Sequence, residues 1–101
     1  MTVTNRFSDE EKKLVISIHE RFDFSLHQQF RDSYKDVTTK DLTFVLDLSQ
    51  TEYMDSSALG MILLLKDHVQ ACAGQLLISK PSDTVRKILE IAQFQRLIKI
   101  D

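Results

Sequence analysis

The stretch 42–65, LTFVLDLSQTEYMDSSALGMILLL, constrains the fold more than any other part of the chain. Its first part, residues 42–48, carries apolar residues on both faces of an alternating pattern, which predicts a central strand buried on both sides. Residues 49–53 are predicted to be a polar link, and a helix follows over about 56–73. Gly74 is predicted to end that helix as the residue just past its last turn. The stretch therefore predicts one strand–helix unit of an α/β fold.

Alternation and capping signals predict two strands and a helix before this stretch. Residues 2–7 are predicted to be a short edge strand. The alternation over 14–18 predicts a half-buried strand that runs on to Glu20 or Arg21. Asp23 or Ser25 caps a first helix, which closes over 37–40. Its predicted buried stripe consists of Leu26, Phe30, Ser33, Tyr34 and Val37.

The C-terminal part continues the alternation of strands and helices. Residues 75–79 are predicted to be a strand, and Ser82 or Asp83 caps a third helix after the Pro81 break. A last short strand ends the chain at 97–100. The order β-β-α-β-α-β-α-β requires parallel crossovers, so we expect one α/β domain over 1–101. Its mixed sheet should have four or five strands flanked by three or more helices.

Composition narrows the classes of function. The 101 residues suit one domain, and 43% hydrophobic with 28% charged residues is ordinary for a globular protein. A formal net charge of −2 argues against nucleic acid as the partner, which needs a basic surface. The apolar runs fall well short of the roughly 20 residues that span a bilayer, so no membrane insertion is expected. With a single cysteine and a polar N-terminus, the chain is predicted to be cytoplasmic.

The second helix separates its apolar and polar residues onto opposite sides. At about 100° per residue, five apolar residues fall within one stripe that should face the core. Ser56 projects to the opposite side and is predicted to face solvent, with Gly60 and Leu63 on the same side. The core stripe is Ala58, Ile62, Leu65, Val69 and Cys72.

The start of this helix is predicted to hold Ser56 in a fixed position. Asp55 is the expected N-cap, because its carboxylate can accept hydrogen bonds from first-turn N–H groups. Met54 and Leu59 occupy the positions of a hydrophobic staple. A phosphate on Ser56 would add about −1.5 to −2 charges at a helix end that tolerates anions. From the residues alone, ordinary capping without any switch remains the alternative interpretation.

The segment Met54-Asp55-Ser56-Ser57-Ala58-Leu59-Gly60, after a strand that ends in Asp47-Leu48, resembles the STAS domain family. It resembles most the bacterial anti-sigma factor antagonists, and the resemblance extends over essentially the whole chain. It implies phosphorylation of Ser56, with Ser57 as second choice. It also implies a partner-binding surface made of Asp23, Phe24, Ser25, Met54, Asp55, Ser57, Leu59, Gly60 and Leu63.

The resemblance also implies the partners of such a switch. A serine kinase or anti-sigma factor of the histidine-kinase-like ATPase fold would bind the unphosphorylated form and phosphorylate it, and a PP2C-type phosphatase would restore it. Two departures stand out: Ala58 replaces the usual glycine, and the segment 20–23, ERFD, lacks the common Gly-Glu-Leu-Asp form. The first should matter little inside a helix. The second leaves open whether the output is a sigma factor or another pathway, such as biofilm formation, motility or stress control.

The remaining polar residues do not form a recognisable catalytic or cofactor motif. His19, His27 and His68 lack metal-ligand spacing, and Cys72 lies on the core stripe, where an inert thiol is expected. We therefore predict no enzyme activity, no metal and no cofactor. The alternative function is that of a constitutive STAS subunit of a membrane transport complex, which docks on an ATPase without phosphorylation of Ser56.

Overall fold

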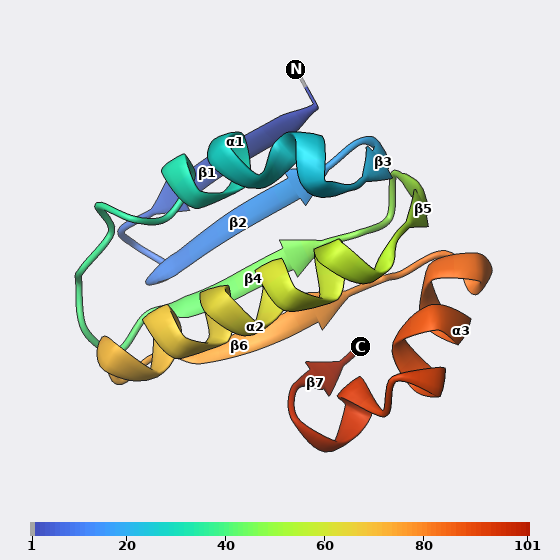
Figure 1. The fold of residues 1–101 in the computed structure, drawn as a ribbon. Coiled ribbons are helices and arrows are strands. Elements are labelled where there is room, and N and C mark those ends of the chain that lie inside the picture. The colour runs from blue at the N-terminus through green and yellow to red at the C-terminus, as the bar shows by residue number, and fades with distance from the viewer. Residues whose placement is uncertain (1) are drawn as a thin grey trace.

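The computed structural model describes residues 2–101 and contains the mixed sheet that the sequence predicts (Figure 1). Its five strands lie in the order β1 (Val3–Ser8), β2 (Lys13–Ile18), β4 (Thr43–Asp47), β6 (Gln75–Ser79) and β7 (Lys99–Ile100). β1 runs antiparallel to β2, and the other neighbours are parallel. The prediction of β4 as the central strand is confirmed, and β1 lies at an edge as expected.

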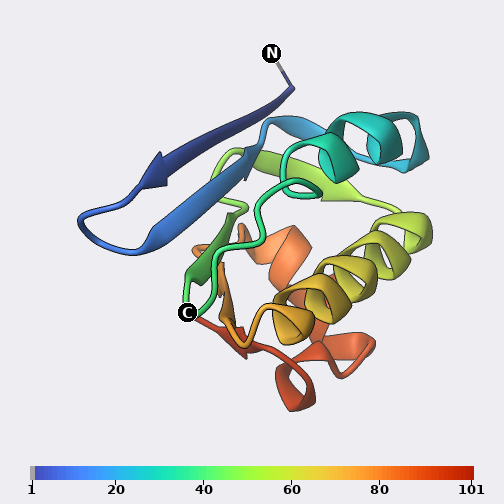
Figure 2. The ribbon, with the colours of Figure 1, turned by 90° about the vertical axis from the view of Figure 1, so that its left-hand side faces the viewer.

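Three helices and two short 3-10 turns connect these strands. They are η1 (Phe24–Leu26), α1 (His27–Asp32), α2 (Ser56–Ala71), α3 (Asp83–Ile91) and η2 (Phe94–Arg96). Figure 2 shows α1 and α2 on the same side of the sheet. α1 ends at Asp32, earlier than predicted, because the chain turns over 33–36. Ser82 is the N-cap of α3, and its side chain accepts a hydrogen bond from the backbone of Val85. None of the helices within residues 2–101 has the length and apolar character needed to cross a membrane.

The core lies between the sheet and the helices and follows the predicted stripes. In β2 the residues Leu14, Ile16 and Ile18 are buried and alternate with half-buried neighbours. In α2 the whole predicted stripe is buried, from Ala58 to Cys72. The ring of Phe30 in α1 packs between those of Phe22 and Tyr34, with centroid distances of 5.0 and 5.6 Å. This packing holds α1 against β3 (Glu20–Phe22), and the contact of Tyr34 with His68 continues it to α2.

The structure contains a second, two-stranded sheet that the sequence does not predict. β2 ends at Ile18, and a separate strand β3 (Glu20–Phe22) pairs in parallel with β5 (Thr51–Met54). The prediction of a polar link over 49–53 is therefore wrong. Thr51 is buried and donates its hydroxyl to the carbonyl oxygen of Ile18 over 2.8 Å. The exposed residues 52 and 53 hide this strand in the sequence, because they interrupt its apolar pattern.

At the end of α2, the residue just past the last turn lies one position earlier than predicted. Ala73, not Gly74, takes the left-handed conformation, with φ of 55°. The N–H of Ala73 bonds to the carbonyl of Gln70 at 3.0 Å and that of Gly74 to Val69 at 2.9 Å, which is the Schellman pattern. Gly74 has a different role, since a Cβ there would lie 2.7 Å from the carbonyl oxygen of Leu42. Its missing side chain lets the turn approach β4 closely.

Candidate functional site

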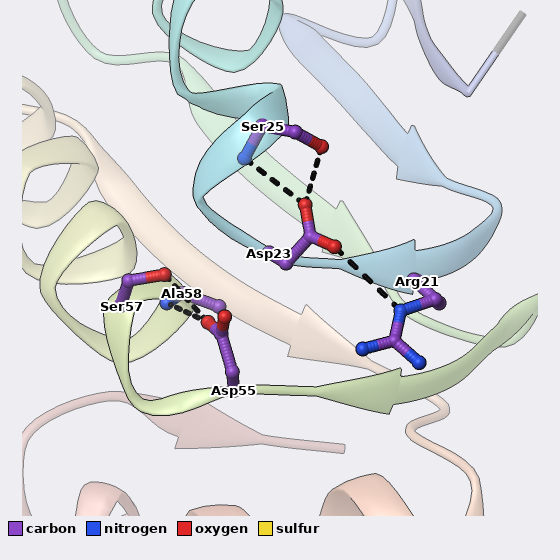
Figure 3. Close-up of polar contacts among 6 residues, drawn as sticks. All are labelled: Arg21, Asp23, Ser25, Asp55, Ser57 and Ala58. Carbon is purple, nitrogen blue, oxygen red and sulfur yellow. Dashed lines mark hydrogen bonds and ion pairs between the residues drawn. The ribbon is translucent and has the colours of Figure 1, made fainter.

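Two aspartates that cap neighbouring helical segments lie next to each other at the ends of β3 and β5 (Figure 3). Phe22 and Met54 are partners in this parallel pair, so Asp23 and Asp55 leave the strands together. The Asp23 carboxylate accepts from the N–H of Ser25 at 3.0 Å. The Asp55 carboxylate accepts from the N–H of Ala58 at 3.1 Å and is the N-cap of α2. The two-stranded sheet thus brings the starts of η1 and α2 to one surface.

The two serines that follow Asp55 have different surroundings. The Ser57 hydroxyl is half-buried and donates to the Asp55 carboxylate. Ser56 is exposed at the first position of α2, and within residues 2–101 its hydroxyl makes no hydrogen bond. The Ser56 oxygen is therefore open to solvent on a helix end that its neighbour Asp55 fixes in place.

The other residues predicted on α2 divide between surface and core. Gly60 is exposed, and a Cβ added there would meet nothing within 4 Å. Leu63 is 38% exposed and lies on the same side of the helix. Leu59 is half-buried and packs against the core. Met54 is only 1% exposed, so a partner can reach little of it, contrary to its place in the predicted surface.

The loop before α1 adds an aromatic side chain and a charged side chain to this surface. Phe24 is 61% exposed and stacks on His27, with ring centroids 4.6 Å apart. The side chain and backbone of Ser25 donate to Asp23, and the Arg21 guanidinium lies 3.6 Å from the same carboxylate. These hydrogen bonds, with that of Ser25 largest, lower the pKa of the Asp23 carboxyl. Asp23 is therefore a carboxylate at neutral pH.

Arg21 and Tyr53 belong to this region and were absent from the predicted site. Their strands pair at this position, and the guanidinium carbon lies 5.0 Å from the centroid of the Tyr53 ring. Such a cation–π contact leaves the Arg21 side chain 65% exposed. The sequence signal was the departure at 20–23, where Arg21 stands in place of an acidic residue of the family pattern.

A groove between the start of α2 and α3 was also missed; we call it the α3 groove. It has a volume of about 360 Å³, and Ser56 lies on its rim. Its apolar lining consists mainly of Tyr53, Met54, Leu59, Ile88 and Ile91. The detectable signal is Ile91, an apolar residue of α3 that lies outside the stripe of the buried Val85 and Leu89.

His68 in α2 and Cys72, the C-cap of α2, both contact the loop after α1. His68 Nε2 lies 2.7 Å from the carbonyl oxygen of Val37, and its ring meets Tyr34 edge-on. Cys72 is buried, with its sulfur 3.8 Å from the same carbonyl oxygen. Among residues 2–101, no group of three His, Cys, Asp or Glu side chains is arranged to hold a metal ion. Both side chains tie the loop after α1 to α2.

Comparison with known proteins decides the family. The model of the STAS domain matches residues 3–101. This chain belongs to the STAS domain family. A STAS-domain containing protein of Pseudomonas aeruginosa is 45% identical over 100 residues, which cover 99% of each chain. The STAS domain therefore accounts for essentially all of the sequence.

Two solved structures show the same fold. The Bacillus anti-sigma factor antagonist SpoIIAA, in its unphosphorylated form, superposes with a TM-score of 0.71 at 23% identity, over 98% of this chain and 86% of that one. A sulfate transporter family protein from Wolinella succinogenes gives a TM-score of 0.78 at 14% identity, over 88% of this chain and 75% of that one. The same STAS fold is thus found in proteins of both descriptions.

Proposed function

We propose that this STAS domain is a regulatory binding protein whose contact with a protein partner is switched by phosphorylation of Ser56. The observation that carries the proposal is the exposed hydroxyl of Ser56 on a rigidly capped helix end. Ser57 is the second choice, since its hydroxyl is half-buried and donates to Asp55. The resemblance to anti-sigma factor antagonists supports this assignment, and the partner surface combines the starts of η1 and α2.

Electrostatics explains how one phosphate could break a complex without unfolding the domain. The phosphate would add about −1.5 to −2 charges at the start of α2. The helix dipole favours an anion there by up to about 1 kcal/mol, so the fold should tolerate it. In a complex the same group must be desolvated or excluded, which costs several kcal/mol when it is left without a partner. The free energy of binding should therefore change far more than that of unfolding.

The family resemblance supports a class of partner for each form. The unphosphorylated protein would bind a serine kinase or anti-sigma factor of the histidine-kinase-like ATPase fold, or another regulator, in the cytoplasm. A PP2C-type phosphatase would remove the phosphate. We propose binding rather than catalysis, because the side chains around Ser56 are engaged in helix capping and in the ion pair of Arg21 with Asp23.

Two measurements on the protein from its native host test this function. Intact mass with peptide mapping should reveal a phosphate on Ser56. Pull-downs should then recover a partner with Ser56→Ala and lose it with Ser56→Asp. Thr39→Asp is the matched control, since it adds the same charge in the exposed loop between α1 and β4 and should keep the partner. Full binding by Ser56→Asp to every partner of Ser56→Ala would refute the switch.

That refuting outcome would favour the second function predicted from the sequence. A constitutive STAS subunit of a transport complex would use the α2 face through Gly60 and Leu63, and the Ser56 hydroxyl would be dispensable. The fold shared with a sulfate transporter family protein is compatible with this role. The two functions differ in one readout, because Leu63→Glu should abolish docking in the second case while Ser56→Asp should not.

A further inference from the structure

The α3 groove extends from Ser56 to the exposed apolar side chains of Tyr53 and Ile91, which take no part in capping α2. Ile91 is 78% exposed and Tyr53 is 42% exposed, and the two face the same groove. Buried Met54 and half-buried Leu59 and Ile88 also line it. Single exposed apolar residues are ordinary, but a contiguous apolar groove of this kind marks an interaction site. A partner that covers Tyr53 and Ile91 would remove the most apolar surface of the groove from water.

Two positive side chains lie beside residues of the groove, and one carboxylate lines it. Arg21 lies over the Tyr53 ring on one side. On the other side Lys87 is exposed and precedes Ile91 by four residues, so the two are neighbours on α3. Asp55 lies on the rim, but its carboxylate already accepts from Ser57 and Ala58. The groove is therefore apolar at its centre, with Arg21 and Lys87 beside it and the Asp55 carboxylate on its rim.

Three nearby acidic residues do not line the groove. Glu90 is one residue from Ile91 and so projects about 100° around the helix from it. Glu52 lines a separate polar hollow with Ser82 and Asp83. Asp23 is paired with Arg21 at 3.6 Å, which reduces the positive charge there without burying the guanidinium. Arg21 and Lys87 are exposed and remain available to an occupant of the α3 groove.

We propose that the α3 groove docks an amphipathic helix of a protein partner, with apolar anchors in the groove and acidic side chains beside Arg21 and Lys87. Helix-in-groove docking uses anchors at i, i+3, i+4 and i+7, and complementary charge fixes its orientation. The coupling to Ser56 rests on the proposed function. A phosphate on the rim would repel the acidic flank and compete for the two cations, which gives the switch a direct target.

The test uses designed peptides as probes, because it then depends on no host partner. One helical peptide of about 14 residues, or four turns, carries leucines at groove-anchor spacing and glutamates on the flanks. A second peptide has lysine at every glutamate position. NMR titration of the complete domain should show shifts around Tyr53, Leu59 and Ile91 with the acidic peptide. The basic peptide should bind at least about tenfold more weakly, a difference of about 1.4 kcal/mol.

Matched variants show whether the groove itself binds. Ile91→Glu should weaken the acidic peptide by at least about tenfold. Leu97→Glu is the control, because Leu97 is an exposed aliphatic residue outside the groove, and it should leave binding unchanged. Arg21→Glu combined with Lys87→Glu should weaken the acidic peptide, whereas Lys99→Glu should not. Equal binding of both peptides, or shifts that avoid the groove, would overturn the proposal.

A phosphoserine encoded at position 56 separates this inference from the proposed function. The phosphorylated domain should bind the acidic peptide at least about tenfold more weakly than the unmodified domain. Equal binding would overturn the coupling between groove and phosphate. If the peptide binds as expected but the host protein carries no phosphate on Ser56, the groove stands and only the proposed function fails.

Discussion

The backbone N–H of Asp55 donates to the carbonyl oxygen of Phe22 over 3.2 Å, and this bond joins the two helix starts that form the candidate surface. Phe22 precedes Asp23, so the bond places the cap of η1 beside the cap of α2. A change at either aspartate can therefore alter a shared surface. The effects of substituting Asp23 and Asp55 can therefore be compared directly.

Asp55→Ala should destabilise the domain by about 1 kcal/mol, since an N-cap side chain that accepts from a first-turn N–H is lost. Asp55→Asn should retain most of that stability, because the amide oxygen can still accept. Urea denaturation followed by circular dichroism measures both. Asp67→Ala, an exposed change within α2, is the control and should stay within about 0.5 kcal/mol of the wild type.

The two glycines should respond to alanine with opposite signs. Gly60→Ala should stabilise the domain by about 0.5–1 kcal/mol, because the site is helical, exposed and open around an added Cβ. Gly74→Ala should destabilise it, since the new Cβ would lie 2.7 Å from the carbonyl oxygen of Leu42. Thermal unfolding of both variants tests this pair. A stable Gly74→Ala protein would show that the turn can move away from β4.

Sequence reasoning succeeded where periodicity and capping agree, and failed where tertiary contacts decide. The stripe of α2 and its Asp55 cap follow from local patterns, as does the burial of β4. β5 could not be found this way, because Glu52 and Tyr53 are polar or exposed and the strand exists only through its pairing with β3. Ala73 carries the left-handed turn, and Gly74 instead allows close packing against the backbone of Leu42.

The candidate surface shows the same division between local and tertiary signals. Ser56 and Asp55 were predicted from the start of one helix. The contribution of Arg21 depends on its register with Tyr53, and the α3 groove depends on how α3 packs beside β5. The fold sets the distances between elements that lie far apart in the sequence. The spacing of residues within one sequence therefore does not predict these distances.

Leucines that are adjacent in α2 should differ sharply in their effect on stability. Leu65→Ala should cost about 2–5 kcal/mol, because the side chain is fully buried and leaves a cavity. Leu64→Ala should change the free energy of unfolding by at most about 0.5 kcal/mol, since that side chain is largely exposed. Chemical denaturation of the two variants under one condition makes the comparison. Similar losses for both would mean that Leu64 contacts something in the folded protein.

The lowered pKa of Asp23 predicts a specific acid dependence. A folded-state pKa below the unfolded value stabilises the fold at pH above the unfolded pKa, and this contribution is lost as pH falls through the folded value. Because Ser25 is the largest cause, Ser25→Ala should raise the pKa of Asp23 more than Arg21→Gln does. NMR titration of the Asp23 carboxyl carbon measures both shifts. A larger effect of Arg21→Gln would reverse the assigned order of causes.

Phosphoserine encoded at position 56 or 57 should distinguish the two candidate sites by stability alone. At Ser56 the phosphate faces solvent at a helix start, so the free energy of unfolding should change by less than about 1 kcal/mol. At Ser57 the modification removes the hydroxyl that donates to Asp55 and places like charges together, which should destabilise the domain by at least about 1 kcal/mol. Urea denaturation of both proteins and the unmodified domain gives the comparison. Equal stability of the two modified forms would remove the structural reason for preferring Ser56.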